Sequence, residues 1–394
     1  MLSSSLKRRT QPSVPCPHYP RCFGCPFIDL SYPEQLDRKR QRIVDAVRSY
    51  PKLADIDIPP VNPSPRQLGY RARVKLVVRR TKDAVMTGLY IPRTHRVIDI
   101  SSCPVHPKPV NTVLHYLKQK IIHLAIAPYD ERSDSGQLRY LDFRYSFARR
   151  EMQLTFVTRK AEFAQGRRLA DSLTRRFPFI TGIIQNINQE RGNVIWGRQS
   201  RMLAGHDLLV ESLDGLKLGY PAAAFSQANP FTAASVYQKV VQLASLNGRE
   251  TVLDLYCGAG PIALSLARFV RFVWGVDDDA AAIEAAEENA RRNGMSNCRF
   301  VAAEVPQGIR EAGRHVSAVD LMVLNPPRKG ILPSAMDAIL NVRPRRVIYV
   351  ACDPESLARD LHRFTSGGYS VTRVEVFDMF PQTREVETVA LLTR

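Results

Sequence analysis

The chain has no run of about 18 uncharged apolar residues, the length that a transmembrane helix requires. Its first 13 residues are polar and basic, and they lack the apolar core of a signal peptide. We also find no internal repeat and no low-complexity tract. These absences predict a globular cytoplasmic protein with no membrane partner. The seven cysteines are then expected to bind metal or to react, because a reducing compartment disfavours disulfides.

Acidic residues are scarce in the N-terminal part of the chain. The 394 residues include 56 Lys and Arg but only 38 Asp and Glu, a net charge of +18. Residues 249–394 contain 18 basic and 19 acidic residues, which leaves 38 basic and 19 acidic residues in the segment 1–248. Solubility alone needs no such segregation. The uneven distribution of charge indicates one part that binds a polyanion, such as nucleic acid, joined to a second part with a different function.

The basic part has a mixed pattern. Apolar residues at helical spacing among many charges predict an amphipathic helix at 34–49. From Tyr70 to Val78, apolar and basic residues alternate, which predicts a strand with Arg71, Arg73 and Lys75 on one face. The rest of this part is predicted to be mostly β, with strands near 88–91, 97–100, 138–147, 152–158 and 182–188 and helices near 107–124 and 164–176.

The C-terminal part alternates between strand-like and helical patterns, which predicts an α/β fold with a doubly wound parallel sheet. The last two strands have no helix between them, so we expect an antiparallel hairpin at the sheet edge. Such a seven-stranded sheet is typical of methyltransferases that use S-adenosylmethionine (AdoMet). We place the domain boundary between residues 215 and 216 and expect helix 34–49 to pack on the domain 216–394. Strands are predicted at 251–256, 272–277, 298–302, 320–324, 345–351, 371–377 and 387–392, and helices at 261–269, 279–293, 333–341 and 354–364.

The sequence VLDLYCGAGP has the form of a cofactor loop between a strand and a helix. Gly258 and Gly260 allow a sharp turn and close approach of a ligand. Asp254 ends the strand, at the edge where open α/β sheets bind ligands. Asp277 ends the next strand and could bind the two hydroxyls of a ribose. These features suit NAD as well as AdoMet, since Ala263 is only a weak departure from G-x-G-x-x-G, and a glycine turn without a ligand is the structural alternative.

The sequence NPPRKG at 325–330 follows the fourth strand of this part. In amino-methyltransferases an N-P-P motif at this place holds a target nitrogen, and an aromatic residue usually follows it. Here Arg328 and Lys329 follow instead. This departure argues against an adenine nitrogen as the methyl acceptor.

Cys352 follows an apolar strand, and Asp353 and Pro354 then begin a helix. Because a helix N-terminus favours negative charge, we expect a thiol of lowered pKa that can act as a nucleophile. The alternative is a small buried apolar residue, the interpretation we give to Cys298. A nucleophile serves a methyltransferase whose target is carbon 5 of uracil, since thiolate addition at carbon 6 activates carbon 5. A base must then remove the carbon 5 proton, and Glu385 and Glu387 are the candidates.

Taken together, these segments resemble the RNA uracil-5 methyltransferases, in particular the iron–sulfur-containing RlmC-like branch that acts on 23S rRNA. The resemblance covers essentially the whole chain. It implies transfer of a methyl group from AdoMet to carbon 5 of a uridine in RNA, through a covalent adduct between Cys352 and carbon 6. The matching segments are CPHYPRCFGC, FSQANP at 225–230, DLYCGAG, NPPR, CDPESLARD and DMFPQT.

The resemblance also implies roles for single residues. It implies Cys352 as the nucleophile and Glu387, rather than Glu385, as the base. Phe225 and Arg328 are expected beside the target base. The expected AdoMet contacts are Gln227, Asp254, Tyr256, Gly258, Gly260, Asp277 and Asn325.

The N-terminal cysteines have a role in the same family, where three of them and one distant cysteine hold a [4Fe–4S] cluster. The resemblance therefore implies that Cys16, Cys22, Cys25 and Cys103 ligate such a cluster. Spacing alone fits structural zinc equally well. Methyl transfer is not a redox reaction, so we expect the cluster to stabilise the fold and to help bind RNA.

No motif specifies the target RNA. We expect a monomer that binds 23S rRNA through Arg71, Arg73 and Lys75, although these residues could instead form an ordinary solvated face. A tRNA uridine methyltransferase is the alternative within the same chemistry. A non-catalytic RNA-binding or assembly protein is the alternative from another class.

Overall fold

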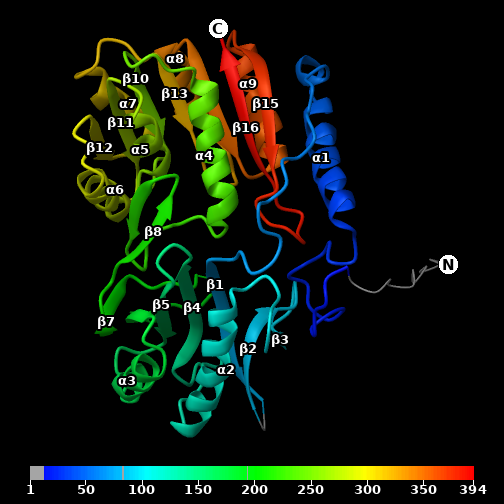
Figure 1. The fold of residues 1–394 in the computed structure, drawn as a ribbon, viewed down its shortest axis with the longest axis vertical. Coiled ribbons are helices and arrows are strands. Elements are labelled where there is room, and N and C mark those ends of the chain that lie inside the picture. The colour runs from blue at the N-terminus through cyan, green and yellow to red at the C-terminus, as the bar shows by residue number, and fades with distance from the viewer. Residues whose placement is uncertain (1–12, 82–83, 193) are drawn as a thin grey trace, which may run out of the picture.

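A computed structural model describes residues 13–81, 84–192 and 194–394, and these form two seven-stranded sheets and a two-stranded hairpin. The C-terminal sheet lies at the top of Figure 1 and the N-terminal sheet at the bottom. The segment on which we based the absence of a signal peptide lies almost entirely outside these residues. Within them, no helix is both long and apolar enough to cross a membrane.

The C-terminal sheet has the strand order β12-β11-β10-β13-β14-β16-β15. Pairing is parallel from β12 to β14, and β16 is antiparallel to both of its neighbours. The predicted fold with its terminal antiparallel hairpin is confirmed, and β16 inserts between β14 and β15, so β15 forms the edge. The strands are β10 Thr251–Leu255, β11 Phe272–Asp277, β12 Cys298–Ala302, β13 Leu321–Leu324, β14 Arg346–Ala351, β15 Ser370–Phe377 and β16 Glu387–Thr393.

Helices cover both faces of this sheet and form an apolar core on each. Two of them, α4 and α7, were not predicted, and in α7 Pro306 and Gly308 look like helix breakers. Gly308 is needed there, since a Cβ would come within 2.2 Å of Val276 Cγ1 on the sheet. The helices are α4 Pro230–Ala244, α5 Pro261–Ala267, α6 Ala280–Arg292, α7 Val305–Gly313, α8 Pro333–Val342 and α9 Pro354–Ser366.

The N-terminal sheet has the order β3-β2-β1-β4-β5-β6-β7. Neighbouring strands are antiparallel except β5 and β6, which are parallel. Helices α2 and α3 share one apolar core with it. The elements are β1 Arg73–Arg80, β2 Val85–Tyr90, β3 Val97–Asp99, α2 Lys108–His123, β4 Leu138–Ser146, β5 Glu151–Thr158, α3 Gly166–Arg176, β6 Ile180–Ile187 and β7 Gln199–Gly205.

The first helix, α1 Tyr32–Arg48, lies beside the C-terminal sheet although it precedes the N-terminal one (Figure 1). Its Ile43, Val44 and Val47 join the core that contains Leu361 and Phe364 of α9. The 3₁₀ turn Pro51–Leu53 follows it, and the hairpin β8 Leu209–Leu213 and β9 Leu216–Tyr220 packs on the C-terminal sheet's other core. The predicted boundary at 215/216 falls in the turn of this hairpin and stays a prediction.

Candidate active site

One cavity of about 1040 Å³ is lined by residues of both parts of the chain. The C-terminal sheet contributes the loops at the carboxyl ends of its parallel strands. The N-terminal part contributes side chains of the segment 71–76 and the cysteine-containing loops. The cavity therefore brings together most of the residues that were predicted to have a chemical role.

The cofactor loop turns sharply after β10. Tyr256, Gly258 and Gly260 all have positive φ, of 61°, 54° and 81°. A Cβ on Gly258 would meet no atom within 4 Å, so this glycine faces open space. The Gly258 amide donates to Asp277 Oδ2 at 2.8 Å and the Asp279 amide to Asp277 Oδ1 at 3.1 Å. Tyr256, Gly258 and Asp277 line the cavity, which gives a ligand access to backbone and carboxylate together.

Asp254 lies behind this loop and is fully buried. Neither carboxylate oxygen has a hydrogen-bond partner of normal geometry among the described residues. Burial raises the pKa of Asp254 to about 8 and the nearby Asp277 adds repulsion, which the amide of Ala263 offsets only in part. Buried polar groups are rarely left unpaired. The open Gly258 and the Asp277 carboxylate in the cavity wall fit a loop that is completed by a polar ligand such as AdoMet, with the buried Asp254 behind it.

Cys352 and Glu387 meet through the pairing of β14 with β16. The antiparallel register joins Val350 to Val389 and Ala351 to Thr388, so its next step sets Cys352 opposite Glu387. Residues opposite each other in such a pair have Cβ atoms about 5 Å apart. Both side chains line the cavity. The sheet topology thus brings a thiol and a carboxyl group to one wall from separate parts of the sequence.

The predicted lowering of the Cys352 pKa is wrong. Burial, and next the carboxyl group of Glu387, raise the pKa of this thiol to about 11, although Arg328 acts in the opposite direction. The N-terminus of α9 is already capped, because Asp353 Oδ1 accepts from the Ser356 amide at 2.9 Å. Burial and the cross-strand carboxyl group of Glu387 outweigh the helix effect on which the prediction relied.

Glu385 and Glu387 differ strongly in environment. Glu387 is 3% exposed, and burial raises its pKa to about 8, with Arg328 opposing. The side chain of Glu385 is 39% exposed and pairs with Arg328. A buried carboxyl group with a pKa near neutrality suits proton transfer better than an exposed one in an ion pair.

Phe225, Gln227 and Asn325 line the same cavity. Phe225 is 69% exposed, unusual for so large an apolar ring, and is therefore free to contact a base. Its segment leads to Asn229, whose side chain caps α4 by accepting from the Thr232 amide at 3.3 Å. Tyr237 of α4 also lines the cavity and was missed, because α4 itself was not predicted. Burial raises the pKa of its hydroxyl well above the usual value, and the nearby Tyr220 and Glu387 act in the same direction.

The basic residues of the β1 segment do not form a solvated outer face. Arg71, Arg73 and Lys75 line the cavity. The Arg73 side chain is only 11% exposed and pairs with Asp142 at 2.9 Å. The Arg71 guanidinium lies 5.6 Å from the ring centroid of Phe380. Burial, and next the charge of Arg73, lower the pKa of Lys75. Positive charge therefore points into the cavity.

The four cysteines assigned to a cluster, Cys16, Cys22, Cys25 and Cys103, line the N-terminal end of the same cavity. All four are free thiols. Burial, and next the neighbouring Cys103, Cys22 and Cys16, raise the pKa of Cys25 to about 12. In the described part of the chain, however, no three His, Cys, Asp or Glu residues are grouped closely enough to hold a metal ion. The thiols are thus neighbours without forming a closed metal site.

The fold and the cofactor loop are those of an AdoMet-dependent methyltransferase. Residues 31–394 match the model of the tRNA (Uracil-5-)-methyltransferase family, and the chain belongs to this family. An uncharacterized RNA methyltransferase of Geobacter sulfurreducens is 39% identical over 394 residues, which cover 100% of this chain and 79% of that protein. One of Gloeobacter violaceus is 36% identical over 382 residues, which cover 97% of this chain and 82% of that protein.

Among solved structures, the chain is similar to the Pyrococcus abyssi tRNA (uracil-54, C5)-methyltransferase in complex with S-adenosyl-L-homocysteine. The TM-score is 0.76 and the identity 26%, over 95% of this chain and 86% of the other. The protein is therefore an AdoMet-dependent enzyme that methylates carbon 5 of uracil in RNA, as the family resemblance implied. The alternative of a non-catalytic RNA-binding protein no longer applies.

Proposed function

We propose that this enzyme methylates a uridine of 23S rRNA through a covalent adduct, with Cys352 as the nucleophile and Glu387 as the base. The observation that carries the proposal is the register of β14 and β16, which sets the two side chains opposite each other in the cavity wall. Bound AdoMet supplies an electrophilic methyl group on a sulfonium. The cavity next to the cofactor loop leaves room for a base that has been turned out of its stack.

The proposed reaction balances in three steps. The Cys352 thiolate adds to carbon 6, and the electron pair of the carbon 5–carbon 6 double bond moves into an enolate. Carbon 5 then bonds to the methyl group, and S-adenosylhomocysteine leaves. Finally Glu387 accepts the carbon 5 proton, the double bond re-forms, and the carbon 6–sulfur bond breaks to release the thiolate. Arg328 supports the first step, because its charge lowers the pKa of Cys352.

The remaining assignments follow from the lining of the cavity. We assign the target base to Phe225 and Arg328. The cofactor is assigned to the cavity-lining residues Gln227, Tyr256, Gly258, Asp277 and Asn325, with Asp254 and Gly260 directly behind them. The exposed ring of Phe225 at the cavity supports stacking on a base that has left its helix.

We infer that Cys16, Cys22, Cys25 and Cys103 hold a [4Fe–4S] cluster. Four free thiols in one cavity wall match the donor set of such a cluster. Burial raises the pKa of Cys103 to about 11, so it would lose its proton only beside a metal cation. The bound cluster would cross-link the N-terminal loop to the segment before α2. Structural zinc is the rival, and metal analysis separates the two.

A second candidate substrate is a tRNA uridine, because the Pyrococcus abyssi enzyme acts on uracil 54 of tRNA. We favour 23S rRNA because the cysteine motif CPHYPRCFGC resembles that of the rRNA branch. We further propose a monomer without a membrane partner, located in the cytoplasm.

The test is to incubate the purified protein with labelled AdoMet and, separately, 23S rRNA and total tRNA from a strain that lacks the enzyme. Mass spectrometry of the nucleosides should show 5-methyluridine in 23S rRNA. If only tRNA is labelled, the substrate is a tRNA uridine and the assignment to 23S rRNA is wrong. A methyl group on any atom other than carbon 5 would contradict the mechanism.

A further inference from the structure

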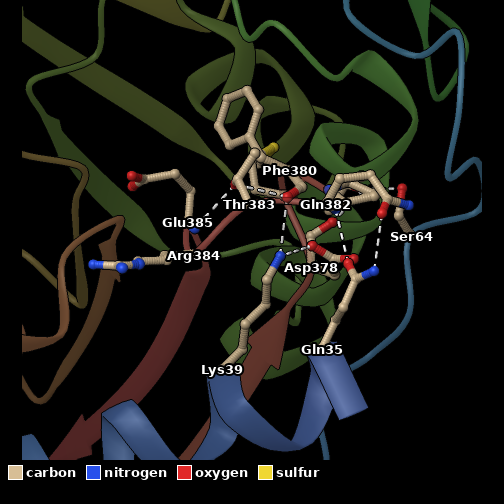
Figure 2. A network of polar contacts seen from close by, with 12 residues as sticks. Gln35, Lys39, Ser64, Asp378, Phe380, Gln382, Thr383, Arg384 and Glu385 are labelled. Carbon is tan, nitrogen blue, oxygen red and sulfur yellow. Dashed lines mark hydrogen bonds and ion pairs between the residues drawn. The ribbon is translucent and has the colours of Figure 1, made fainter. Parts of the chain in front are cut away.

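The segment between β15 and β16, residues 378–386, leads directly into Glu387. We call it the base segment. Three residues of α1 reach its polar groups: Gln35, Lys39 and Arg42 (Figure 2 labels the first two). They stand at positions i, i+4 and i+7, so they share one face of the helix. We call this set the α1 face.

Lys39 makes the central contact. It pairs with Asp378, and both side chains are 0% exposed. Its Nζ also donates to the carbonyl oxygen of Phe380 at 3.0 Å. Tyr32 at the start of α1 donates its hydroxyl to Asp378 Oδ2 at 2.9 Å. The buried carboxylate is thus held from two positions on α1.

Gln35 and Arg42 hold the rest of the base segment. Gln35 Nε2 donates to Gln382 Oε1 at 2.9 Å, and its Oε1 accepts from the Gln382 amide at 2.8 Å. Arg42 Nη1 donates to the Arg384 carbonyl at 2.6 Å. The α1 face therefore contacts residues 378, 380, 382 and 384 in turn.

The same network reaches the loop that carries Phe225 and Gln227. Asn229 Nδ2 donates to the Met379 carbonyl at 2.9 Å, and Thr232 Oγ1 donates to the Asp378 carbonyl at 3.2 Å. Asn229 Nδ2 also donates to Ser64 Oγ at 3.2 Å, and the Thr232 hydroxyl oxygen lies 3.0 Å from the same Ser64 Oγ. The start of the base segment is thus tied to the start of α4.

A buried ion pair is a poor way to gain stability, because the cost of desolvating two charges offsets their attraction. Apolar residues of similar volume would fill the same space. The ion pair does add direction, since Lys39 must meet both the Asp378 carboxylate and the Phe380 carbonyl. Burial lowers the pKa of Lys39 and raises that of Asp378, which reflects this desolvation.

We propose that Lys39 and Asp378, with Gln35, are positioning residues for the removal of the carbon 5 proton after methyl transfer. They fix the base segment so that Glu387 points at the carbon 5 proton of the adduct. This inference rests on the proposed covalent mechanism. Cys352 belongs to the end of β14 and makes no hydrogen bond to the α1 face in the described residues, so addition and methyl transfer should be less sensitive than proton removal.

The test uses the full-length protein and RNA that contains the target uridine. We compare the double variant Lys39→Met/Asp378→Asn, which removes both charges together, with Gln35→Met. Lys52→Met is the matched control, since Lys52 is exposed and its side chain donates to Ser366 Oγ on α9. For each protein, steady-state kcat, the KM for AdoMet, single-turnover methyl transfer and the denaturation-resistant protein–RNA complex are measured. Glu387→Gln is run in parallel.

Both test variants should lose about tenfold or more in kcat, the scale of a small misplacement of a catalytic group. Their KM for AdoMet and their single-turnover methyl transfer should stay near wild type, while methylated covalent complex accumulates as in Glu387→Gln. Lys52→Met should behave as wild type. A merely structural role would lower the amount of active protein without trapping the complex.

Two results would overturn the inference. If Glu387→Gln traps the complex but neither test variant does, the base is correct and the positioning role is not. If Glu387→Gln traps nothing, the covalent mechanism fails and the inference fails with it. Gln35→Met keeps the test valid if the double variant does not fold.

Discussion

The two seven-stranded sheets build one cavity in different ways. The C-terminal sheet offers the ends of its strands, where Tyr256, Asn325 and Cys352 follow buried runs. The N-terminal part offers the basic side chains of β1 and the segment before it, with Lys75 and Arg73 pointing into the cavity. The C-terminal sheet thus provides reactive groups, and the N-terminal sheet provides positive charge. This division matches the uneven charge of the sequence.

The C-terminal and N-terminal sides of the cavity also differ in the environment of their charged groups. The carboxyl groups Asp254 and Glu387 on the C-terminal side are buried and have raised pKa values. On the N-terminal side, Arg73 forms an ion pair with Asp142 at 2.9 Å. Chemistry on one side and phosphate binding on the other should therefore be separable by mutation.

The largest expected effect is on the C-terminal side. Cys352→Ala should lower methylation by on the order of 10⁴-fold, as for loss of an essential catalytic residue. RNA and AdoMet binding should remain, because the cavity is otherwise intact. Cys298→Ala, in the strand β12, is the matched control and should turn over normally. Retained activity in Cys352→Ala would rule out the covalent route.

On the N-terminal side, the cysteines should determine metal content. Protein purified without oxygen should contain iron and sulfide and absorb visible light, and Cys103→Ala should lose both. Cys298→Ala should keep them. One zinc per chain in colourless protein would contradict the cluster and support the structural zinc site.

A smaller effect is expected for stability against pH. The pKa of Glu387 is raised from 4.5 to about 8, so between these values the folded state binds more protons than the unfolded state. Stability from this group is present below pH 4.5 and is lost as the pH rises through 8. We therefore compare the free energy of unfolding of Glu387→Gln with that of the wild type at each pH. This difference should favour the variant more at pH 8.5 than at pH 5, by on the order of a few kcal/mol.

Denaturant unfolding at both pH values measures this difference. Asp254→Asn should show the same trend, because burial raises its pKa similarly. Substitution of the exposed Glu284 of α6 by Gln should leave the profile unchanged. An equal loss of stability at both pH values in Glu387→Gln would contradict the raised pKa.

The smallest effect concerns RNA. Lys75→Ala should reduce the slope of log affinity against log salt by about 1 if Lys75 contacts a phosphate. AdoMet affinity should not change, since Lys75 belongs to the other sheet. Arg71→Ala should act in the same way, and Lys52→Met should not. An unchanged slope in both variants would move the phosphate-binding surface away from β1.

The same comparison explains which features could be predicted from the sequence. Buried parallel strands leave continuous apolar runs, so the seven strands of the C-terminal sheet were located to within about two residues. The groups after them, such as Cys352 and Asp277, were then placed by their position at strand ends. Helix α7 was missed because a glycine that its packing requires also looks like a breaker.

Features that depend on distant pairing could not be predicted from local sequence. Burial, and next Glu387, raise the pKa of Cys352, and Glu387 lies beside Cys352 only because β14 pairs with β16. The choice between Glu385 and Glu387 rested on resemblance, and their different burial appears only in the fold. The packing of α1 on the C-terminal domain was expected, but the contacts of Lys39 with Asp378 and the Phe380 carbonyl appear only in the fold.

The central claim is that Cys352 adds to the base and Glu387 completes the reaction. It is tested most directly by mass spectrometry of Glu387→Gln after incubation with RNA and AdoMet under denaturing conditions. The account predicts a covalent protein–RNA complex that carries the new methyl group, while Glu385→Gln turns over and leaves no complex. Normal turnover by Glu387→Gln, together with a trapped complex in Glu385→Gln, would contradict it.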